Sequence, residues 1–302
     1  MNSKAPHIVQ YQGSKRILAP QITRYMPKRF NRLLEPFSGM AAISVAVAQE
    51  GRTERYFIND LNAPLIRLLK SAIEEPKTLV EKYDVLWNQQ FEYGDGHVQH
   101  FYDVRTRFND GDKSPENMLY LLARCVKGSV RYGKNGNFNQ SPDKRRHGTT
   151  PQNVKNNVFA ISCLLKGKST FLTCDYHEIV AMARQGDLVY MDPPYQGVTC
   201  SQDSRYLSGV PFDEFVDAVE TLNRKNVDFL ISYDGACGDK AYGETLPSKL
   251  GCKKILLNAG ISTQSTLLGR KAVTFEALYI SRNLQSNRVT VPCQLSLLEA
   301  TV

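Results

Sequence analysis

Short apolar segments alternate with helix-like segments near both ends of this 302-residue sequence, and this alternation constrains its fold. Residues 33–37 (LLEPF) and 56–60 (YFIND) have the length and composition of buried strands. Between them, residues 41–51 (AAISVAVAQEG) are typical of a helix that ends at a glycine. A strand, helix, strand order predicts parallel strands with the helix packed on the sheet. We therefore expect an α/β fold with a Rossmann-like sheet.

The alternation stops near residue 75 and resumes near residue 170, so we expect an insertion in the sheet. The intervening residues predict mostly helices. We predict a sheet domain of residues 1–74 and 167–283, an inserted domain of residues 75–166 and a tail of residues 284–302. The later segments expected as strands are residues 170–175, 187–192, 228–234, 253–258 and 275–283, and those expected as helices are residues 62–75 and 212–225.

Most of the formal charge of +8 lies in residues 124–155, where eight basic residues face one acid, a net charge of +7. A charge run is usually a solvated surface. Here glycines, amides and a tyrosine are interleaved with the charge, which is the composition of a loop that follows phosphates and reaches base edges. We predict that this segment binds nucleic acid through Arg124, Lys127, Arg131, Tyr132, Lys134, Asn139, Lys144, Arg145 and Arg146.

Other features of the composition indicate a cytoplasmic protein. No run of eighteen apolar residues occurs, and the first residues lack the apolar core of a signal peptide. The seven cysteines are odd in number and form no C-x-x-C pair, which favours reduced thiols over disulfides. His97 and His100 form an H-x-x-H pair without further ligand candidates, so we expect no metal.

A glycine turn followed by an acid predicts a nucleoside-bearing cofactor. Gly39 lies in the turn between the first expected strand and its helix, and Asp60 lies 21 residues later at the end of the second strand. That spacing is typical of a carboxylate that binds ribose hydroxyls. One glycine without a G-K-[ST] sequence is not a phosphate cradle, so we expect no pyrophosphate. A tight strand–helix connection is the commonest interpretation of a lone glycine turn. Taken singly, a helix cap before Asn62 at Asp60 and an ordinary surface position for Lys15 are interpretations comparable to a role in ligand binding.

The sequence VYMDPPY, residues 189–195, predicts a strand that ends at an acid, because proline cannot donate to a sheet. Asp192 and a rigid carbonyl beside it could accept both N–H bonds of an exocyclic base amine and direct its lone pair. Tyr195 offers a face on which an extruded base can stack. An enzyme reaches such an amine only after flipping the base out of the duplex. The plainer interpretation is a strand followed by a Pro-Pro turn.

The ordered set YQGSK, EPFSG, FINDLN, a basic insertion and VYMDPPY resembles the DNA adenine-N6 methyltransferases of the Dam-like, D12 class. The resemblance runs from about Tyr11 to about Asn283, most of the chain. It implies S-adenosylmethionine as the cofactor, double-stranded DNA as the substrate, and a bacterial or phage-encoded, DNA-associated enzyme. The sheet domain would be catalytic and residues 75–166 would recognise the target.

The resemblance also assigns roles to single residues. Tyr11 and Lys15 match the N-terminal cofactor motif, with Lys15 near the methionine carboxylate. Phe37 and Gly39 would line the cofactor pocket, Asp60 would hold the ribose, and Asp175 would end a strand near the cofactor adenine. Asp192, Pro193 and Tyr195 match the target-adenine site, and Asp192 would have a lesser role in cofactor contact. RYGKNGNFN, residues 131–139, resembles the hairpin that recognises DNA.

Two departures from the family pattern limit what is carried over. Ala41 stands where the family usually has a second glycine, and its methyl group leaves less room for a ligand to approach the backbone of this turn. After residues 138–139 (FN) the family often continues Val-Pro-Phe-Gly, whereas residues 140–146 here are QSPDKRR. The target sequence is therefore not carried over.

Several rival functions use similar residues. An N4-cytosine methyltransferase performs the same chemistry, but an acid rather than serine at Asp192 favours adenine. An RNA adenine methyltransferase and a catalytically idle DNA-binding module are two further rivals, and the complete DPPY sequence argues against the idle module. A role in restriction and modification is consistent with the family, but neither a partner endonuclease nor an oligomeric state can be read from the sequence.

The C-terminal tail contains a sequence, QLSLL, that resembles the short motif by which bacterial replication and repair proteins bind the DNA sliding clamp. A glutamine would fix the register and leucines would fill an apolar pocket. Alternatively, the leucines fold back on the protein's own core. The residues concerned are Gln294, Leu295, Leu297 and Leu298.

Overall fold

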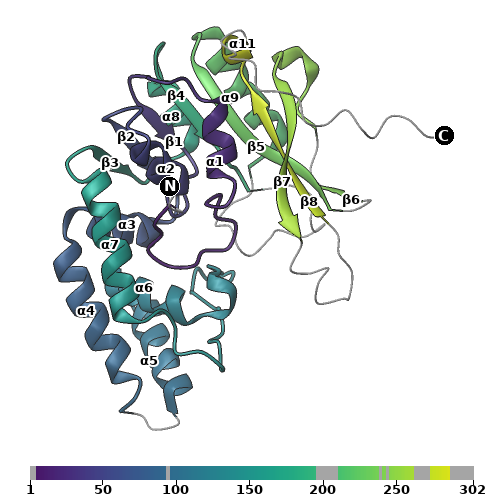
Figure 1. Cartoon of the computed structure of the whole chain (residues 1–302). Helices are drawn as coiled ribbons and strands as arrows, with labels where there is room; N and C mark the ends of the chain where they lie inside the picture. The colour runs from purple at the N-terminus through teal and green to yellow at the C-terminus, as the bar shows by residue number, and fades with distance from the viewer. Residues whose placement is uncertain are drawn as a thin grey trace.

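One mixed sheet dominates the computed structural model, which describes residues 5–92, 96–194, 210–237, 240–242, 245–261 and 273–285. Within these residues the strand order is β3–β2–β1–β4–β5–β8–β7, and β6 pairs with β5 (Figure 1). The strands are β1 Leu33–Glu35, β2 Tyr56–Asn59, β3 Ser169–Leu172, β4 Leu188–Met191, β5 Asp228–Cys237, β6 Lys240–Tyr242, β7 Lys253–Ile261 and β8 Val273–Ile280.

The strand order reverses between β1 and β4, which defines where a ligand can enter. Leu33 in β1 is in register with Tyr56 in β2 and with Leu188 in β4, and both pairings are parallel. Strand β8 is antiparallel to β5 and to β7. In an open α/β sheet, a crevice forms beyond the carboxyl ends of the strands at such a reversal. Asp187 at the opposite end of β4 forms an ion pair with Arg32, which fixes the starts of β1 and β4 side by side.

Helices cover both faces of the sheet, because successive residues of a strand point to opposite sides. Leu33 packs in a core with α1 (Ala19–Ile22), α2 (Ala42–Gln49) and α3 (Ala63–Glu74). Leu34 packs in a second core with α8 (Tyr176–Met182) and α9 (Phe212–Arg224). The α/β, Rossmann-like sheet that the sequence predicts is thus confirmed. Further short helices are η1 Thr23–Tyr25, η3 Val126–Gly128, η4 Ser248–Leu250 and α11 Arg282–Gln285.

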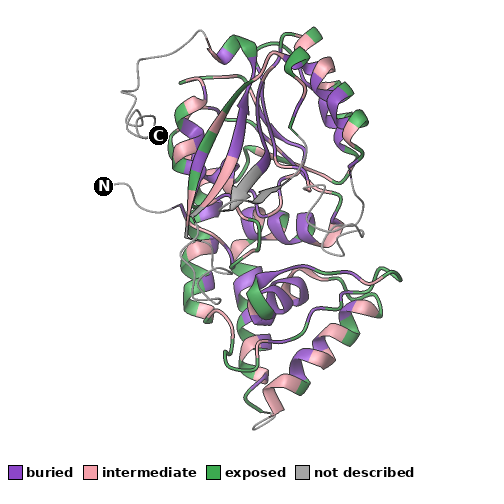
Figure 2. Cartoon of the chain, turned by 90° about the vertical axis from the view of Figure 1, so that its right-hand side faces the viewer, coloured by how far each residue is buried: buried purple, intermediate pink, exposed green. Residues whose placement is uncertain are grey.

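The insertion is largely helical, as predicted, and lies to one side of the sheet (Figure 1). Its helices are α4 (Pro76–Gln89), α5 (His97–Asn109), α6 (Pro115–Arg124) and α7 (Pro151–Leu165), and α4, α6 and α7 begin with a proline, which is favoured in the first helical turn. Buried residues line their inner faces (Figure 2). These residues belong to the same core as α2 and α3, and the predicted domain boundaries stay a prediction.

The basic segment folds into a hairpin, which we call the 124–143 hairpin. Its two arms are joined by backbone hydrogen bonds from Val126 to Ser141 (3.1 Å) and from Asn139 to Arg131 (3.0 Å). A turn closed by a bond from Gly133 to the carbonyl of Asn137 connects the arms. Buried and exposed side chains alternate at Arg131 and Tyr132 and along residues 138–142, as they do in an extended chain.

The other segments predicted as strands or helices also occur where the sequence places them, with ends that differ by a few residues. Ala41, the departure noted above, has a left-handed backbone with φ of 53°, the conformation in which glycine is favoured. Among the described residues, no helix is long and apolar enough to span a membrane.

Candidate active site

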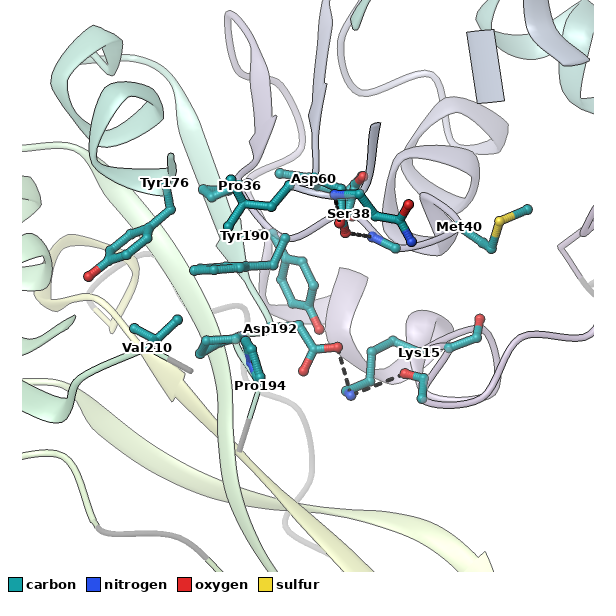
Figure 3. Close-up of a pocket in the computed structure, with 18 of the residues that line it drawn as sticks. Lys15, Pro36, Ser38, Met40, Asp60, Tyr176, Tyr190, Asp192, Pro194 and Val210 are labelled. Atoms are coloured by element: carbon teal, nitrogen blue, oxygen red, sulfur yellow. Dashed lines mark hydrogen bonds and ion pairs between the residues drawn. The ribbon is translucent and has the colours of Figure 1, made fainter. Parts of the chain in front are cut away.

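A pocket of about 230 Å³ lies at the carboxyl ends of β1, β2 and β4, at the reversal of strand order (Figure 3). A single water needs roughly 10–15 Å³ by the same measure, so the pocket has room for a ligand of many atoms. The N-terminal segment forms its opposite wall. Eight residues predicted from the sequence line it: Tyr11, Lys15, Phe37, Gly39, Asp60, Asp175, Asp192 and Pro193.

Asp60 holds the glycine turn from the end of β2. Its Oδ2 accepts a hydrogen bond from the backbone N–H of Gly39 (3.0 Å), and its Oδ1 accepts one from Asn62 (2.9 Å). Burial raises the pKa of Asp60, and these two donors oppose the shift. A carboxylate has about four acceptor positions, so each oxygen retains capacity for a ligand hydroxyl.

Gly39 allows the turn to pass beneath Tyr11. Its φ is 50°, and a Cβ atom at this position would lie 3.3 Å from Cε1 of the Tyr11 ring. A larger residue would therefore strain the backbone and displace the ring. The close approach brings the N-terminal segment over the turn that follows β1.

Asn59 joins the ends of three strands, a role that the sequence patterns did not assign to it although it lies within FINDLN. Its side-chain amide donates to the carbonyl of Pro36 (2.9 Å) and to that of Cys174 (3.0 Å). Its Oδ1 accepts a hydrogen bond from the backbone N–H of Cys174 (3.0 Å). Asn59 thereby fixes the chain after β1 and β3 relative to β2, and with it the pocket wall.

Lys15 and Asp192 form an ion pair across the pocket, with 2.7 Å between Nζ and Oδ2 (Figure 3). Oε2 of Glu276, from β8, lies 3.5 Å from the same ammonium. Lys15 is 6% exposed, and a buried ammonium requires such partners. Burial raises the pKa of Asp192 to about 6, Lys15 opposes this shift, and Glu276 adds to it.

Glu35 is a second buried acid in the pocket wall, and the sequence patterns did not assign it to the site. It lies at the end of β1, and its Oε2 accepts hydrogen bonds from the backbone N–H (2.9 Å) and the hydroxyl of Ser44. Burial raises its pKa to about 7, the Ser44 donors oppose the shift, and the charge of Asp192 adds to it. The signal for Glu35 was the acid of EPFSG, which directly precedes the glycine turn.

Aromatic rings form an apolar slot between Asp60 and the end of β4. The rings of Phe37 and Tyr176 are 5.2 Å apart, and Tyr190 contributes to the same wall. The Tyr176 hydroxyl and the Ser38 hydroxyl are buried without a hydrogen-bond partner among the described residues. Asp175 caps α8 through a bond from the His177 N–H (2.9 Å). The slot thus combines stacking faces with unused polar groups, which suits a planar polar ligand.

The basic residues predicted to contact DNA separate into two groups. Arg124 is 0% exposed and donates to the backbone carbonyls of Asp143 (3.1 Å) and Arg146. The prediction that Arg124 contacts DNA is wrong, because its guanidinium is used inside the protein to hold the hairpin. Tyr132 is also buried, and it lies in the pocket wall rather than on the outer surface. The exposed residues of the set are Lys127, Arg131, Lys134, Asn139, Lys144, Arg145 and Arg146.

Some predicted residues lie outside the described part of the chain. These are Tyr195, expected beside the target base, and the tail residues Gln294, Leu295, Leu297 and Leu298. Conversely, the structure adds pocket residues to which the sequence patterns gave no role. These are Val210, Pro211 and Glu214, which lie in no motif, and Asn62, the last residue of FINDLN. They come from helix starts and loops whose spacing in the sequence carries no signal.

The sheet order and the pocket at its reversal define a Rossmann-like methyltransferase. A model of the D12 class of N6-adenine-specific DNA methyltransferases matches residues 11–259. The chain belongs to this family of enzymes. The resemblance seen in the sequence motifs is confirmed, and with it, at the level of the family, the prediction of an adenine-specific DNA methyltransferase.

Similar proteins include DNA adenine methylases from bacteria and phages. The retron Ec67 DNA adenine methylase of Escherichia coli is 29% identical over 200 residues, which cover 63% of this chain and 64% of that protein. The type II methyltransferase M1.LlaDCHI of Lactococcus lactis subsp. cremoris is 29% identical over 239 residues, 74% and 79% of the two chains. The DNA N-6-adenine-methyltransferase of Escherichia phage P1 is 28% identical over 238 residues, which span 76% of this chain but 30% of the phage protein.

Proposed function

We propose that this chain transfers a methyl group from S-adenosylmethionine to the N6 amine of an adenine flipped out of duplex DNA. The observation that carries the proposal is the position of Asp192. Its carboxylate lies at the carboxyl end of β4, within the pocket at the reversal of strand order, and pairs with Lys15 at 2.7 Å. The family of the chain supports the same reaction.

The residues of the pocket fit the proposed cofactor. Asp60 would accept the ribose hydroxyls, Phe37 and Tyr176 would flank the adenine ring, and the Ser38 and Tyr176 hydroxyls are free to bond its polar atoms. The amino acid part needs charges of both signs, which Lys15 and the acids Glu35 and Asp192 supply. When bound, S-adenosylmethionine supplies a methyl group activated by a positively charged sulfur.

Asp192 and Pro193 would prepare the target amine. The lone pair of N6 is delocalised into the adenine ring, so the free amine is a poor nucleophile. If the carboxylate of Asp192 and the carbonyl of Pro193 accept its two N–H bonds, the nitrogen moves toward tetrahedral geometry and its lone pair becomes available. As the C–N bond forms, the bond between the methyl carbon and the sulfonium sulfur would break, and S-adenosylhomocysteine would leave as a neutral thioether. The positive charge would pass to N6, and the carboxylate of Asp192 would then accept one proton from it. Tyr195 would stack on the flipped base.

The 124–143 hairpin and the residues that follow it would bind the duplex. Lys127, Arg131 and Lys134 are exposed on the hairpin, and Lys144, Arg145 and Arg146 are exposed after it. Such residues neutralise phosphates and supply affinity without base specificity. Asn139 is exposed on the same hairpin and has the amide that pairs with adenine edges.

Transfer of a labelled methyl group to unmethylated plasmid DNA, followed by nucleoside analysis, tests the proposal. We expect label in N6-methyl-2′-deoxyadenosine and not in N4-methyl-2′-deoxycytidine, with no transfer to RNA of the same sequence. The Asp192→Asn variant should lose at least a hundredfold in rate, since it loses the anionic acceptor while keeping the shape of the side chain. Label on cytosine or on RNA would overturn the proposal in favour of the corresponding rival.

Two narrower roles rest on the sequence alone. The type II methyltransferase among the relatives makes a restriction and modification role plausible for this chain too, and loss of cleavage by a cognate endonuclease after methylation would test it. The sliding clamp remains a proposed partner of the tail. A peptide of residues 288–302 should bind purified clamp at micromolar concentration, and a peptide with Gln294→Ala and Leu297→Ala should not.

A further inference from the structure

One contact between the 124–143 hairpin and the pocket is a buried hydroxyl group. The Tyr132 hydroxyl donates to Oδ1 of Asn62 at 3.0 Å, although the two residues lie 70 positions apart in the sequence. Both side chains are buried and both line the pocket. Tyr132 also packs edge-on against Phe138 of the opposite arm, with ring centroids 6.2 Å apart. The tyrosine is therefore held by its own hairpin on one side and by Asn62 on the other.

Asn62 continues this contact to the acid that faces the proposed cofactor. Its backbone N–H donates to Oδ1 of Asp60 (2.9 Å), and Oδ2 of Asp60 accepts the N–H of Gly39 (3.0 Å). Hydrogen bonds thus connect Tyr132 through Asn62 to the carboxylate of Asp60, and through that carboxylate to the turn at Gly39. Both Asp60 and Gly39 line the pocket. Movement of the hairpin relative to α3 would change the position of the group expected to bind ribose.

A second contact joins the hairpin to the N-terminal wall of the pocket. The N–H of Gln12 donates to the carbonyl of Gly128 at 2.9 Å. Gly128 has φ of 58°, and a Cβ atom there would lie 2.1 Å from the carbonyl oxygen of Gln10. Only glycine fits this approach. The segment that leads to Lys15 is therefore packed directly on the base of the hairpin.

The outer side of the same arm carries the charge expected to meet DNA. Arg131 is exposed, whereas Tyr132, the next residue, is buried in the pocket wall. The alternation of an extended arm thereby places a phosphate-binding side chain and a pocket side chain on adjacent residues. A duplex that fixes Arg131 and a ligand that fixes Tyr132 would order the same short piece of backbone.

We propose that Tyr132 is a positioning residue that couples DNA binding on the 124–143 hairpin to occupancy of the cofactor pocket, through its hydrogen bond to Asn62. This inference rests on the proposed function. Each ligand would order the contact between Tyr132 and Asn62. The second ligand to bind would then pay a smaller cost in conformational entropy, because this contact is already ordered. By thermodynamic linkage, the cofactor must then strengthen DNA binding by the same factor by which DNA strengthens cofactor binding.

The coupling factor is measurable as the ratio of two dissociation constants. Titration calorimetry gives the dissociation constant of S-adenosylhomocysteine, a product that cannot react, in the absence and in the presence of saturating fragments of unmethylated plasmid DNA. For the wild-type protein we expect a ratio of about 5 or more, in the range typical of coupled sites. Tyr132→Phe removes only the hydroxyl, and we expect the ratio to fall close to one. The ratio compares two dissociation constants of the same variant, so any change in cofactor affinity without DNA cancels from it.

Tyr83→Phe is the matched control. The Tyr83 side chain is also buried, and its hydroxyl donates a partly buried hydrogen bond to the carbonyl of Thr149 at 2.6 Å, but Tyr83 does not line the pocket. Both variants should lower the melting temperature, whereas Tyr83→Phe should keep the wild-type ratio. An unchanged ratio in Tyr132→Phe, or an equal loss in Tyr83→Phe, would overturn the inference. If the wild-type protein binds both ligands but the ratio is one, the coupling inference is overturned and the proposed function stands. If the wild-type protein fails to bind S-adenosylhomocysteine or DNA, the proposed function is overturned as well.

Discussion

Nζ of Lys15 lies 2.7 Å from Oδ2 of Asp192, so a lysine of the N-terminal segment forms an ion pair with the acid at the end of β4. Glu276 approaches the same ammonium to 3.5 Å from the other side. Two carboxylates therefore share one lysine in a largely buried position. The charge state of Asp192 depends on both neighbours, and the proposed chemistry requires its anionic form.

The rate of methyl transfer should rise as the pH increases through about 6, as Asp192 loses its proton. We call this rise the acidic limb of the pH–rate profile. Burial raises the pKa of Asp192 to about 6, the ammonium of Lys15 opposes the shift, and the charge of Glu276 adds to it. Removing the cation in Lys15→Met should therefore move the limb to higher pH, and Glu276→Gln should move it to lower pH. Single-turnover rates at saturating cofactor, measured from pH 5 to 8, show each limb directly. Shifts in the same direction for both variants would contradict the assigned charges.

Asp60→Asn should weaken cofactor binding without weakening DNA binding. The asparagine oxygen still accepts one backbone N–H, but the negative charge is lost. A hydrogen bond from a ribose hydroxyl to a charged group contributes about 1.5–3 kcal/mol, against about 0.5–1.5 kcal/mol for one to a neutral group. We expect the dissociation constant of S-adenosylhomocysteine to rise at least tenfold by calorimetry. Affinity for the duplex in a filter-binding assay should stay within twofold. An unchanged cofactor affinity would exclude Asp60 from the ribose site.

Glu35→Gln should flatten the pH dependence of folding stability. The pKa of Glu35 in the folded protein is about 7, above the ordinary value of 4.5, so the folded state binds this proton more tightly than the unfolded chain. Its contribution is full below about pH 4.5 and is lost as the pH rises through 7. The loss corresponds to about 3 kcal/mol in the free energy of unfolding.

Urea unfolding at pH 4.5, 6 and 8 tests this. The pKa of Asp192 is also raised, so both proteins should lose some stability as the pH rises over this range. The wild type should lose more than the Glu35→Gln variant, because only the wild type retains the Glu35 carboxyl group. Parallel curves for the two proteins would show that Glu35 does not titrate in this range.

Exposed and buried arginines of the basic segment should behave differently when replaced by alanine. Arg131→Ala and Arg145→Ala should each reduce the slope of log affinity against log salt concentration by about 0.9, the contribution of one phosphate contact. Arg124→Ala should instead destabilise the fold, since its guanidinium donates to the carbonyls of Asp143 and Arg146 inside the protein. Each such bond from a charged donor is worth about 1.5–3 kcal/mol. Duplex binding as a function of salt, together with melting temperatures, separates the two classes. A salt slope that stays unchanged in both exposed variants would exclude the hairpin as the duplex contact.

Ala41→Gly should leave stability nearly unchanged, although glycine is the usual family residue there. The left-handed backbone at φ of 53° costs alanine about 1–2 kcal/mol, which glycine would relieve. Glycine adds about 0.4–1 kcal/mol of freedom to the unfolded chain, and removing a fully buried methyl group costs about 0.8 kcal/mol. The terms nearly cancel, so the free energy of unfolding should change by less than about 1 kcal/mol. A change above 2 kcal/mol in urea unfolding would show that one of these terms is misjudged.

Local patterns in the sequence were sufficient for the sheet and for the principal pocket residues. Apolar runs of strand length, glycine turns and prolines at helix starts depend on near neighbours in the chain, and these predicted β1, β2 and β4 with few errors at their ends. Asp60 and Asp192 were found because each directly follows a strand, and Gly39 was found because it lies in the turn between β1 and α2. The carboxyl ends of parallel strands meet at one edge of the sheet, so these positions imply one site.

Contacts between distant segments were decided only by the tertiary structure. The pairing of Lys15 with Asp192 and the hydrogen bond from Tyr132 to Asn62 join segments whose separation in the sequence carries no information about distance. Burial was equally hidden within the basic run, where Arg124 is enclosed and Arg131 is exposed. Sequence by itself determined which residue types follow each strand and where charge accumulates. Which way each side chain faces depends on how the helical insertion and the hairpin pack on the sheet, because packing decides which charges remain in water and which must find partners inside.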